Sequence, residues 1–475
     1  MEMASRARQT PGAGAVARAR EARRADRREQ ARNEQRVALA LAMIDAVAEH
    51  GYGKTTVAHV ISRAGVSRKT FYRHFSNKEE CFLATYDQIS ARAIRRMEQA
   101  YQEGVGWPGR VEAAIGALFE AAIESPGAVR LVLIEINALG PAGIERWERS
   151  IVHYERFVHE ALKLAPGEGD FSDAVVKAVI GGLNRVLYRR VLRGERAELL
   201  AVIPDLVTWF ASYYPTPAAL LAEPSSTRAA ARMPPRLLEG GRAPGTLAPH
   251  ASVDGRRGLP GGEYNVSRSY VVHSQRERIL DAVANLTAAN GYTDLKVEEI
   301  AEQAAVSLNA FYEHFADKED AFLVAYEIGH SKALASALRA YSAAGEWKLG
   351  VRAGIEALFE FLAEEPSFAH LALVDALFAT ARTAERSNIG IAAFAKMLVP
   401  GLEEAPEQSA GSPVTIEAIA GGIFDLCLHY AFQGRIGELP ELVPSATYIA
   451  LAPFLGSDAA ARVAIGPPAR STVAG

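Results

Sequence analysis

The sequence is poor in cysteine, with Cys81 and Cys427 as its two cysteines in 475 residues. Two cysteines so far apart build neither a disulfide framework nor a cysteine-based zinc site, which favours a reducing, intracellular setting. Long uncharged apolar runs are scarce too. The longest, 206–222, holds two prolines and falls short of the roughly 20 apolar residues that a membrane span needs. We therefore expect a cytoplasmic protein with no membrane partner.

An excess of one charge sign is also missing, because 52 Lys and Arg residues nearly balance 56 Asp and Glu residues, for a net charge of −4. This balance excludes a histone-like polycation but leaves room for a local basic face. Catalytic signatures are missing as well: there is no phosphate-cradling glycine loop, no HExxH motif and no nucleophile elbow. We therefore predict a protein that is not an enzyme and needs no metal or cofactor.

Strand-like alternation of apolar and polar residues is scarce, whereas helical spacing recurs. The i, i+3, i+4 pattern of an amphipathic helix is followed by Leu39, Ala42, Met43, Ala46 and Val47. The same pattern returns in Ile279, Ala282, Val283 and Leu286. These patterns predict an all-α fold.

An offset of 240 residues aligns most of the chain with itself. The matched pairs include Gly51-Tyr52 with Gly291-Tyr292, Phe71-Tyr72 with Phe311-Tyr312, His74-Phe75 with His314-Phe315, and Gly181-Gly182 with Gly421-Gly422. The period is far longer than the roughly 20–50 residues of a solenoid repeat. Two whole units, called here the first and the second repeat, therefore stand in tandem.

A tight turn separates two short helical segments in the first repeat. Gly65 can adopt a positive φ in this turn, and Ser67 can cap the next helix. In that helix, Phe71 and Phe75 are four residues apart and should face the core, so that Arg68, Lys69, Tyr72 and Arg73 project outward. This geometry is that of a helix-turn-helix whose second helix suits the major groove. The alternative is an ordinary helical hairpin with a solvated charged face.

A longer string of residues narrows the choice. It consists of Gly51-Tyr52, Thr55-Thr56-Val57, Ala64-Gly65-Val66-Ser67, Phe71-Tyr72-Arg73-His74-Phe75 and Lys78-Glu79, and it resembles the TetR family of bacterial transcriptional regulators. The resemblance covers about 35–215 and 273–455. It implies, in each repeat, a three-helix DNA-binding domain and a larger helical domain that dimerises and binds small, often apolar ligands. The second repeat departs from the pattern, with Ala305 in the turn and Leu308-Asn309-Ala310 after it.

The expected domain organisation combines the repeat, the resemblance and the composition. Residues 215–262 hold 8 prolines and 7 glycines, as a linker does, and residues 1–33 hold nine arginines and four acids. The arginine-rich segment is either a disordered tail or an arm that contacts DNA. We expect a disordered arm at 1–33, helix-turn-helix domains at 34–101 and 273–341, regulatory helical domains at 102–214 and 342–456, a linker at 215–272 and a tail at 457–475.

The two repeats differ in charge. Residues 54–80 carry six basic and two acidic residues, whereas the equivalent residues 294–320 carry two basic and eight acidic ones. Glu298, Glu299, Glu302 and Glu313 would repel the phosphate backbone that dominates DNA affinity. We therefore expect the first repeat to bind DNA and the second to have weakened; the alternative is that these acids face away from DNA.

The candidate DNA-binding residues follow from their chemistry. Arg68 and Lys69, at the start of the recognition helix, can read guanine edges or bind phosphate. Phosphate contacts suit Thr55, Thr56, Tyr72, His74 and Lys78, although His74 and His314 fit packed or capping roles equally well. The predicted set is Lys54, Thr55, Thr56, Ser67, Arg68, Lys69, Thr70, Tyr72, Arg73, His74 and Lys78, with Ser307, Leu308, Asn309, Tyr312, His314 and Lys318 in the second repeat.

The leading hypothesis is a DNA-binding transcriptional regulator, a repressor that a small apolar effector releases from double-stranded DNA. The alternative is a ligand-binding or protein-interaction module of the same fold that no longer binds DNA. Gly181-Gly182 and Gly421-Gly422 predict close helix packing. The resemblance implies that they lie in the penultimate helices that form the dimer interface of the family, so the repeats pair either within one chain, as a pseudo-dimer, or between two chains. The four tryptophans, Trp107, Trp147, Trp209 and Trp347, are either core residues or reporters of an effector pocket.

Overall fold

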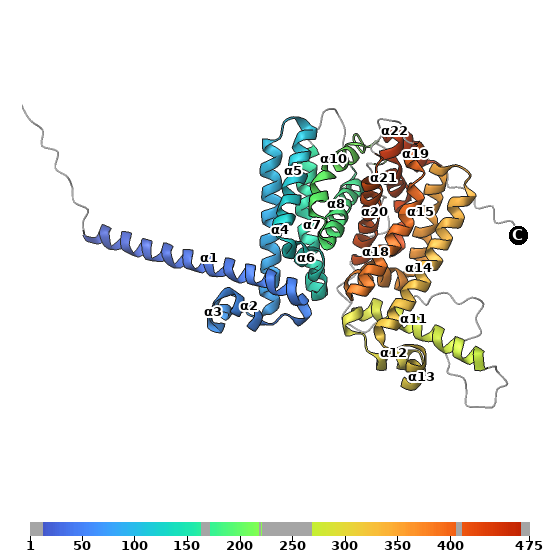
Figure 1. The fold of residues 1–475 in the computed structure, drawn as a ribbon, viewed down its shortest axis with the longest axis horizontal. Helices are drawn as coiled ribbons and strands as arrows, with labels where there is room; N and C mark the ends of the chain where they lie inside the picture. Colours follow the sequence, from blue (N-terminus) through green and yellow to red (C-terminus); the bar gives the residue numbers. More distant parts are fainter. Residues whose placement is uncertain (1–12, 163–171, 218–219, 221–267, 405–410, 467–475) are drawn as a thin grey trace, which may run out of the picture. The chain divides into compact units, whose positions relative to one another are not determined.

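The computed structural model describes residues 13–162, 172–217, 220, 268–404 and 411–466 (Figure 1). Its elements are helices, and no β-strand occurs within these ranges, which confirms the all-α prediction. The chain divides into two compact bodies, one ending at Ile89 and one beginning at Ser90.

The first body is a three-helix reading head followed by the start of a long helix. It comprises α1 (Ala13–Lys54), α2 (Val57–Ala64), α3 (Arg68–His74) and the first half of α4 (Lys78–Glu103). Its core contains the fully buried Leu39, Met43, Phe71 and Phe82. The helical spacing predicted around Leu39 therefore corresponds to a buried face.

The remainder of the first repeat belongs to the second body. Its elements are α5 (Gly106–Glu124), α6 (Pro126–Leu133), η1 (Glu135–Leu139), α7 (Pro141–Leu162), α8 (Asp173–Arg193), α9 (Arg196–Ala201) and α10 (Ile203–Ala211). Ser172 caps α8 by accepting a hydrogen bond from the Val175 N–H, and Gly194 ends it at φ 72°. Gly194 thus ends α8 in the left-handed conformation that glycine adopts most easily.

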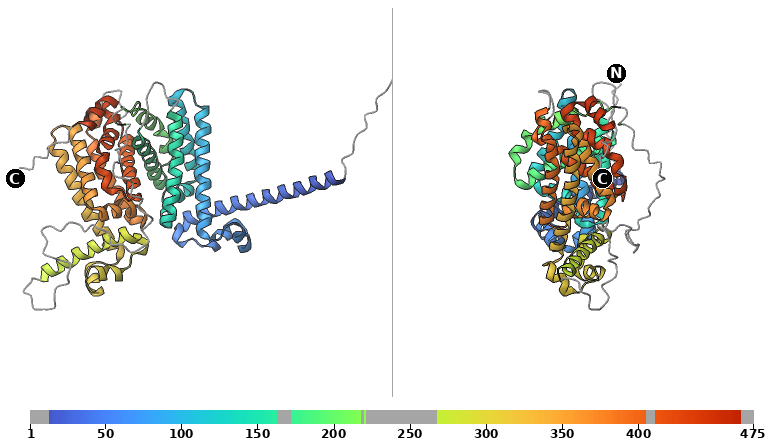
Figure 2. Two further views of the ribbon diagram at one scale, coloured as in Figure 1. Left: turned by 180° about the vertical axis from the view of Figure 1, so that it is seen from behind. Right: turned by 90° about the vertical axis from the view of Figure 1, so that its right-hand side faces the viewer.

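The second repeat begins with its own reading head, α11 (Arg268–Asp294), α12 (Val297–Gln303) and α13 (Leu308–His314). The following elements are α14 (Lys318–Ala343), α15 (Trp347–Glu364), α16 (Pro366–His370), η3 (Leu371–Asp375), α17 (Ala376–Phe378), α18 (Ala381–Ala395), η4 (Lys396–Leu398), α19 (Gly401–Glu404), α20 (Pro413–Phe432), η5 (Ile436–Leu442), α21 (Val443–Leu455) and α22 (Ser457–Ile465). In this repeat α14 packs on α15, α15 on α21, and α21 on α20 (Figure 1; Figure 2, left).

The N-terminal arm differs from the expectation of disorder. Residues 1–12 lie outside the described residues, but α1 starts at Ala13 and continues through the segment predicted to be disordered. Alanine and arginine are strong helix formers, so the composition that suggests a solvated tail also favours a helix. The arm is therefore a helical extension, and α1 changes direction at Gly51, whose φ of 72° only glycine adopts easily.

Two other boundaries are corrected. The predicted tail at 457–475 begins as α22, in which Ala460, Ala461 and Ala464 are buried, so its alanines belong to the core rather than to a solvated end. The predicted linker at 215–272 is shorter at both ends. Ser457 donates a hydrogen bond to the Pro215 carbonyl oxygen at 2.7 Å, and α11 already starts at Arg268.

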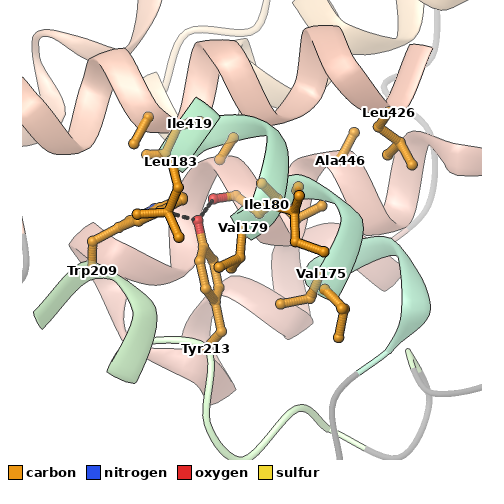
Figure 3. Close-up of a cluster of buried hydrophobic side chains, with 14 of the residues drawn as sticks. Val175, Val179, Ile180, Leu183, Trp209, Tyr213, Ile419, Leu426 and Ala446 are labelled. Carbon is orange, nitrogen blue, oxygen red and sulfur yellow. Dashed lines mark hydrogen bonds between the residues drawn. The ribbon is translucent and has the colours of Figure 1, made fainter. Parts of the chain in front are cut away.

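The two repeats pack on each other inside the second body through α8 and α20 (Figure 3). Val175, Val179 and Leu183 of α8 meet Ile419 and Leu426 of α20 in a continuous apolar core. A Cβ added to Gly182 would lie 2.6 Å from the Ala418 carbonyl oxygen, and one added to Gly422 would clash with the Ala178 carbonyl oxygen. The predicted close helix packing at both glycine pairs is confirmed.

One helix among the described residues, α20, is long and apolar enough to cross a membrane by length and composition. It carries Glu417 and Asp425, and more than half of its apolar stretch is buried inside the protein. Its hydrophobicity is accounted for by its place between α8, α18 and α21.

Candidate nucleic-acid interface

The helix-turn-helix of the first repeat is shaped by local capping. Thr56 caps α2 by accepting a hydrogen bond from the His59 N–H, and Gly65 ends α2 in the left-handed region at φ 64°. Ser67 then caps α3 by accepting from the Thr70 N–H at 3.1 Å. Because a turn of this kind needs a left-handed residue, Gly65 sets the angle at which α3 leaves the head.

The outer face of α3 is basic and open to solvent. Arg68, Lys69 and Arg73 are exposed, and Tyr72 is 51% exposed, whereas Phe71 and Phe75 are buried. The inward and outward faces are those that the four-residue spacing of the phenylalanines predicts. Three cations and a phenol on one helical face can contact both phosphates and base edges.

Other predicted residues border this face. Lys54 at the end of α1 is exposed, and so are the capping residues Thr56 and Ser67. Thr70 is half-buried, and its hydroxyl lies 2.9 Å from that of Ser67. These four residues remain available at the rim of the predicted interface.

Thr55 is a correction. Its side chain is 2% exposed, and its hydroxyl donates to the carbonyl oxygens of Gly51 at 2.7 Å and Ala46 at 3.2 Å. The predicted phosphate contact of Thr55 is therefore wrong. The residue instead holds the kink at the end of α1, while its neighbour Thr56 faces solvent.

His74 and Lys78 are also engaged within the head. The His74 ring lies 3.0 Å from Gln35 Oε1, and burial, aided by Arg36, Arg32 and Arg73, lowers the pKa of His74. The Lys78 ammonium sits 3.9 Å above the Tyr52 ring and donates to the Tyr52 carbonyl oxygen at 2.9 Å, and burial lowers the pKa of Lys78. For His74, the packed role is the one observed.

The sequence analysis missed two cations on α1. Arg32 and Arg36 are exposed, and their charges act on His74 at the end of α3. Their spacing of four residues places them on one side of the continuous helix α1, which an arm disordered up to residue 33 would not provide. The basic surface of the first head therefore extends from α3 onto α1.

The second reading head has the same helix caps and turn as the first but exposes different side chains. Ser307 caps α13 by accepting from the Ala310 N–H at 3.1 Å, and Ala305 occupies the turn with φ 51°. Lys318 sits 4.7 Å from the Tyr292 ring and donates to the Tyr292 carbonyl oxygen at 3.1 Å, as Lys78 does with Tyr52. His314, like His74, is half-buried.

The exposed face of α13 lacks cations. Leu308 is 44% and Tyr312 56% exposed, Asn309 is exposed, and Glu313 stands where the first repeat has Arg73. Glu298 and Glu302 on α12 are exposed as well, and Glu299 pairs with Lys296 at 3.1 Å. The second head therefore exposes acidic side chains where the first head exposes cations.

A second candidate site is an apolar cavity of about 120 Å³ in the second repeat. Tyr326, His330 and Cys427 are among the lining residues, and burial lowers the pKa of His330. The rest of the lining is apolar and includes Val351, Ile355, Leu358, Leu362, Phe368, Leu373, Ile391, Phe394, Ala395, Leu398, Ile423 and Phe424. A wall of this kind suits a small apolar molecule.

Neither the tryptophans nor the first repeat supply this wall. Trp347 donates its indole N–H to the Met397 carbonyl oxygen at 2.9 Å, and Trp209 donates to the Tyr213 hydroxyl at 2.7 Å, so both are core residues. Glu155, which is 240 residues before the cavity residue Ala395, forms an ion pair with Lys177 at 3.2 Å. The equivalent place in the first repeat is therefore charged.

A short π-helical element connects the cavity with the second reading head. In η3, Ala372 and Leu373 line the cavity, and Asp375 accepts a hydrogen bond from the Tyr292 N–H at 2.9 Å. Asp375 also pairs with His370 at 3.1 Å. Because Tyr292 follows the kink at Gly291, this hydrogen bond joins η3 to the end of α11.

Comparisons with known proteins agree with this geometry. The family model described as bacterial regulatory proteins, tetR family, matches residues 44–85 and 279–325. An uncharacterised helix-turn-helix transcriptional regulator of Mycobacterium tuberculosis is 26% identical over 161 residues, which cover 34% of this chain and 83% of that protein. The transcriptional activator FasR of Mycolicibacterium smegmatis is 30% identical over 89 residues, covering 19% of this chain and 41% of FasR.

Solved structures of similar proteins cover about one repeat. The fatty acid degradation regulator FadR from Bacillus halodurans has a TM-score of 0.35 and 17% identity, and the match covers 37% of this chain and 94% of FadR. The FadR regulator from Bacillus subtilis, solved with stearoyl-CoA, has a TM-score of 0.34 and 17% identity. That match covers 37% of this chain and 96% of the Bacillus subtilis protein.

Proposed function

We propose that this transcriptional regulator, which is built from two TetR-like units in tandem, reads DNA with its first repeat and senses a small apolar effector with its second. The observation that carries the proposal is a difference in exposed side chains between two recognition helices whose backbones are arranged in the same way. The outer face of α3 presents Arg68, Lys69 and Arg73, whereas that of α13 presents Leu308, Asn309 and Glu313 at the equivalent positions.

Electrostatics explain why this difference decides which head binds. Each phosphate neutralised by a cation releases counterions, and this term supplies most of the affinity of non-specific binding. The first head adds Arg32, Arg36 and Lys54 to its three cations on α3, and all six side chains are exposed. The exposed acids of the second head oppose this binding, because they repel the phosphates instead of neutralising them.

The sensing role rests on the cavity and its connection to η3. An effector that fills the apolar wall displaces Ala372 and Leu373, and Asp375 carries the displacement to Tyr292. Because a ligand shifts an equilibrium only through its differential affinity for two states, the effector must favour one position of η3. We infer a cytoplasmic repressor that loses DNA when the effector binds.

The test of DNA binding uses fragments captured from genomic DNA by the full chain. The variant Arg68→Ala/Lys69→Ala/Arg73→Ala should lose at least 100-fold in affinity in gel shifts, because three charge-assisted contacts of about 1–3 kcal/mol each are removed. The matched control, Leu308→Ala/Asn309→Ala, removes side chains from the equivalent positions and should change affinity less than threefold.

Equal losses in the two variants would contradict the division of labour. No capture of DNA by the wild-type chain, at low salt, would favour the alternative function, a ligand-binding or protein-interaction module that has lost DNA binding. Retention on a DNA column and its salt slope separate these outcomes before any operator is known.

The test of sensing uses medium- and long-chain fatty acids as apolar probes, followed by thermal unfolding and by gel shift. We expect a probe that fits the cavity to raise the melting temperature and to lower DNA affinity in the same concentration range. The variant Ala395→Leu, which narrows the cavity, should abolish both effects. A probe that changes DNA affinity equally in wild type and variant would remove the cavity from the mechanism.

A further inference from the structure

We infer that the interface between α8 and α20 is selective for unlike repeats, so that a first repeat pairs with a second repeat and two like repeats reject each other. The partner that occupies the α8 face is the second repeat of the same chain. This inference concerns assembly and does not depend on DNA binding or on the effector.

The interface has the geometry of a two-fold dimer made within one chain. Gly181 of α8 faces Asp425 of α20, and Gly421 of α20 faces Arg185 of α8. Gly182 likewise faces Ala418, and Gly422 faces Ala178. Adding 240 to the number of the α8 residue and subtracting 240 from that of the α20 residue converts each of these contacts into another contact of the same set. In a two-fold interface residue i contacts j and residue j contacts i, which is the relation seen here.

Arg185 and Asp425 are therefore equivalent positions on the two helices, and the charge of each acts on the other across the interface. Both line one small cavity of about 80 Å³, together with Tyr188 and Gly421. Burial raises the pKa of Asp425 to about 7, and the nearby Arg185 charge opposes this rise. Arg185 also donates to the Asn388 side-chain oxygen of the second repeat.

Like pairs would place at this axis either two arginines or two buried carboxyl groups that have no arginine beside them. With the same geometry, two first repeats would bring Arg185 against Arg185 of the copy, and two second repeats would bring Asp425 against Asp425. A buried charge without its counter-charge is costly, and like charges across an interface suppress wrong partners. The charges at the axis therefore favour the unlike pair.

A second set of charges has the same preference. Glu417 of α20 pairs with Arg189 at 3.1 Å and with Arg190 at 3.0 Å on α8. The residue equivalent to Glu417 in the first repeat is Lys177, so that two first repeats would bring Lys177 toward arginines. The residues equivalent to the arginines are His429 and Tyr430, so that two second repeats would lose both ion pairs.

Hydrogen bonds outside the helices are also particular to the unlike pair. The Tyr213 hydroxyl donates to the Ile449 carbonyl oxygen at 2.8 Å, and the Tyr448 hydroxyl donates to the Tyr213 carbonyl oxygen at 3.0 Å. The positions equivalent to these tyrosines hold Pro453 and Thr208. Both acceptors are backbone carbonyl oxygens, so the donors decide: a pair of first repeats would lack the donor of the second bond, and a pair of second repeats would lack the donor of the first. The apolar core between the helices is indifferent to the pairing, so the polar groups supply the selectivity.

The first experiment leaves the interface sequence intact. A site for a sequence-specific protease is inserted between Gly240 and Gly241, the full chain is folded and cleaved, and the products are analysed by native mass spectrometry. We expect complexes of one first half with one second half. Complexes of two first halves or of two second halves, after dilution and reconcentration, would overturn the inference, and so would separation into free halves.

The second experiment reverses charges in the uncleaved chain. Asp425→Arg should lower the melting temperature by roughly 5–10 °C, because it sets a second cation beside Arg185. The swapped variant Arg185→Asp/Asp425→Arg should recover at least half of that loss. Additive losses in the double variant would overturn the inference. If Asp425→Arg does not fold, the second charge set gives the same comparison, between the swap Glu417→Arg/Arg189→Glu/Arg190→Glu and the single variant Glu417→Arg.

Discussion

At the scale of single residues, the turn of each helix-turn-helix shows how one side chain changes the stability of a shared frame. Gly65 and Ala305 occupy the same place, with φ of 64° and 51°. The left-handed region costs an alanine roughly 1–2 kcal/mol and a glycine little. A Cβ at position 65 would meet no atom within 4 Å, so the difference comes from the backbone alone.

We expect Ala305→Gly to stabilise the second head by about 1 kcal/mol, less the entropy that glycine adds to the unfolded chain. The matched change Gly65→Ala should destabilise the first head by a similar amount. Amide hydrogen exchange in α12 and α2 reports each head separately. A loss of protection in α12 on Ala305→Gly would show that the alanine is not strained.

His429 is a second residue with a measurable consequence. Burial, with Lys177 and Arg435 nearby, lowers the pKa of His429 from 6.5 to about 4. Between these pH values the unfolded chain binds this proton and the folded chain does not, so the contribution of His429 to stability is lost as the pH falls from about 6.5 to 4.

Between pH 7 and pH 5, we expect the free energy of unfolding of His429→Gln to fall by less than that of wild type. The difference should be on the order of 1 kcal/mol. Urea unfolding of wild type and variant at the two pH values measures the difference. His153→Gln is the control for the loss of an exposed histidine. Identical pH profiles for His429→Gln and wild type would contradict the buried, neutral state.

At the scale of elements, α3 and α13 have the same length and the same serine cap, and both bury a phenylalanine at their centre. They differ on the outer face alone. A helix that is presented correctly but carries the wrong charge should gain DNA affinity when its charge is corrected.

We therefore expect Leu308→Arg/Asn309→Lys/Glu313→Arg to bind DNA more tightly than wild type and to elute from a DNA column at higher salt, with a steeper salt slope. The control Leu308→Gln/Asn309→Gln/Glu313→Gln removes the acid without adding cations and should gain much less. Unchanged retention of the first variant would mean that α13 is not accessible to DNA in the full chain.

At the scale of the whole molecule, pairing of unlike repeats leaves one chain with one basic reading head. A palindromic operator presents two half-sites about one helical turn apart, and each requires a basic head. We expect the free protein to scatter light as a single chain of 51.1 kDa and its complex with a full operator to contain two chains. One chain bound to a full palindrome, with both half-sites footprinted, would show that the acidic head also binds DNA.

The sequence by itself determined the architecture and the site in outline. The 240-residue offset revealed two repeats, helical spacing indicated an all-α chain, and Gly65, Ser67 and the phenylalanines of α3 predicted which side chains face outward. These signals are local, since caps, turns and amphipathic faces depend on residues within a few positions of one another. The charge difference between Arg73 and Glu313 could likewise be found by counting.

The tertiary structure decided what depends on distant neighbours. Thr55 and Thr56 are adjacent and chemically equal, yet the fold buries the first and exposes the second, because the end of α1 packs over one of them. The alanines of α22, the cavity around His330 and the meeting of Arg185 with Asp425 all arise from contacts between segments far apart in the chain. Burial, and with it the cost of an unpaired charge, is set by these contacts and is absent from any local pattern.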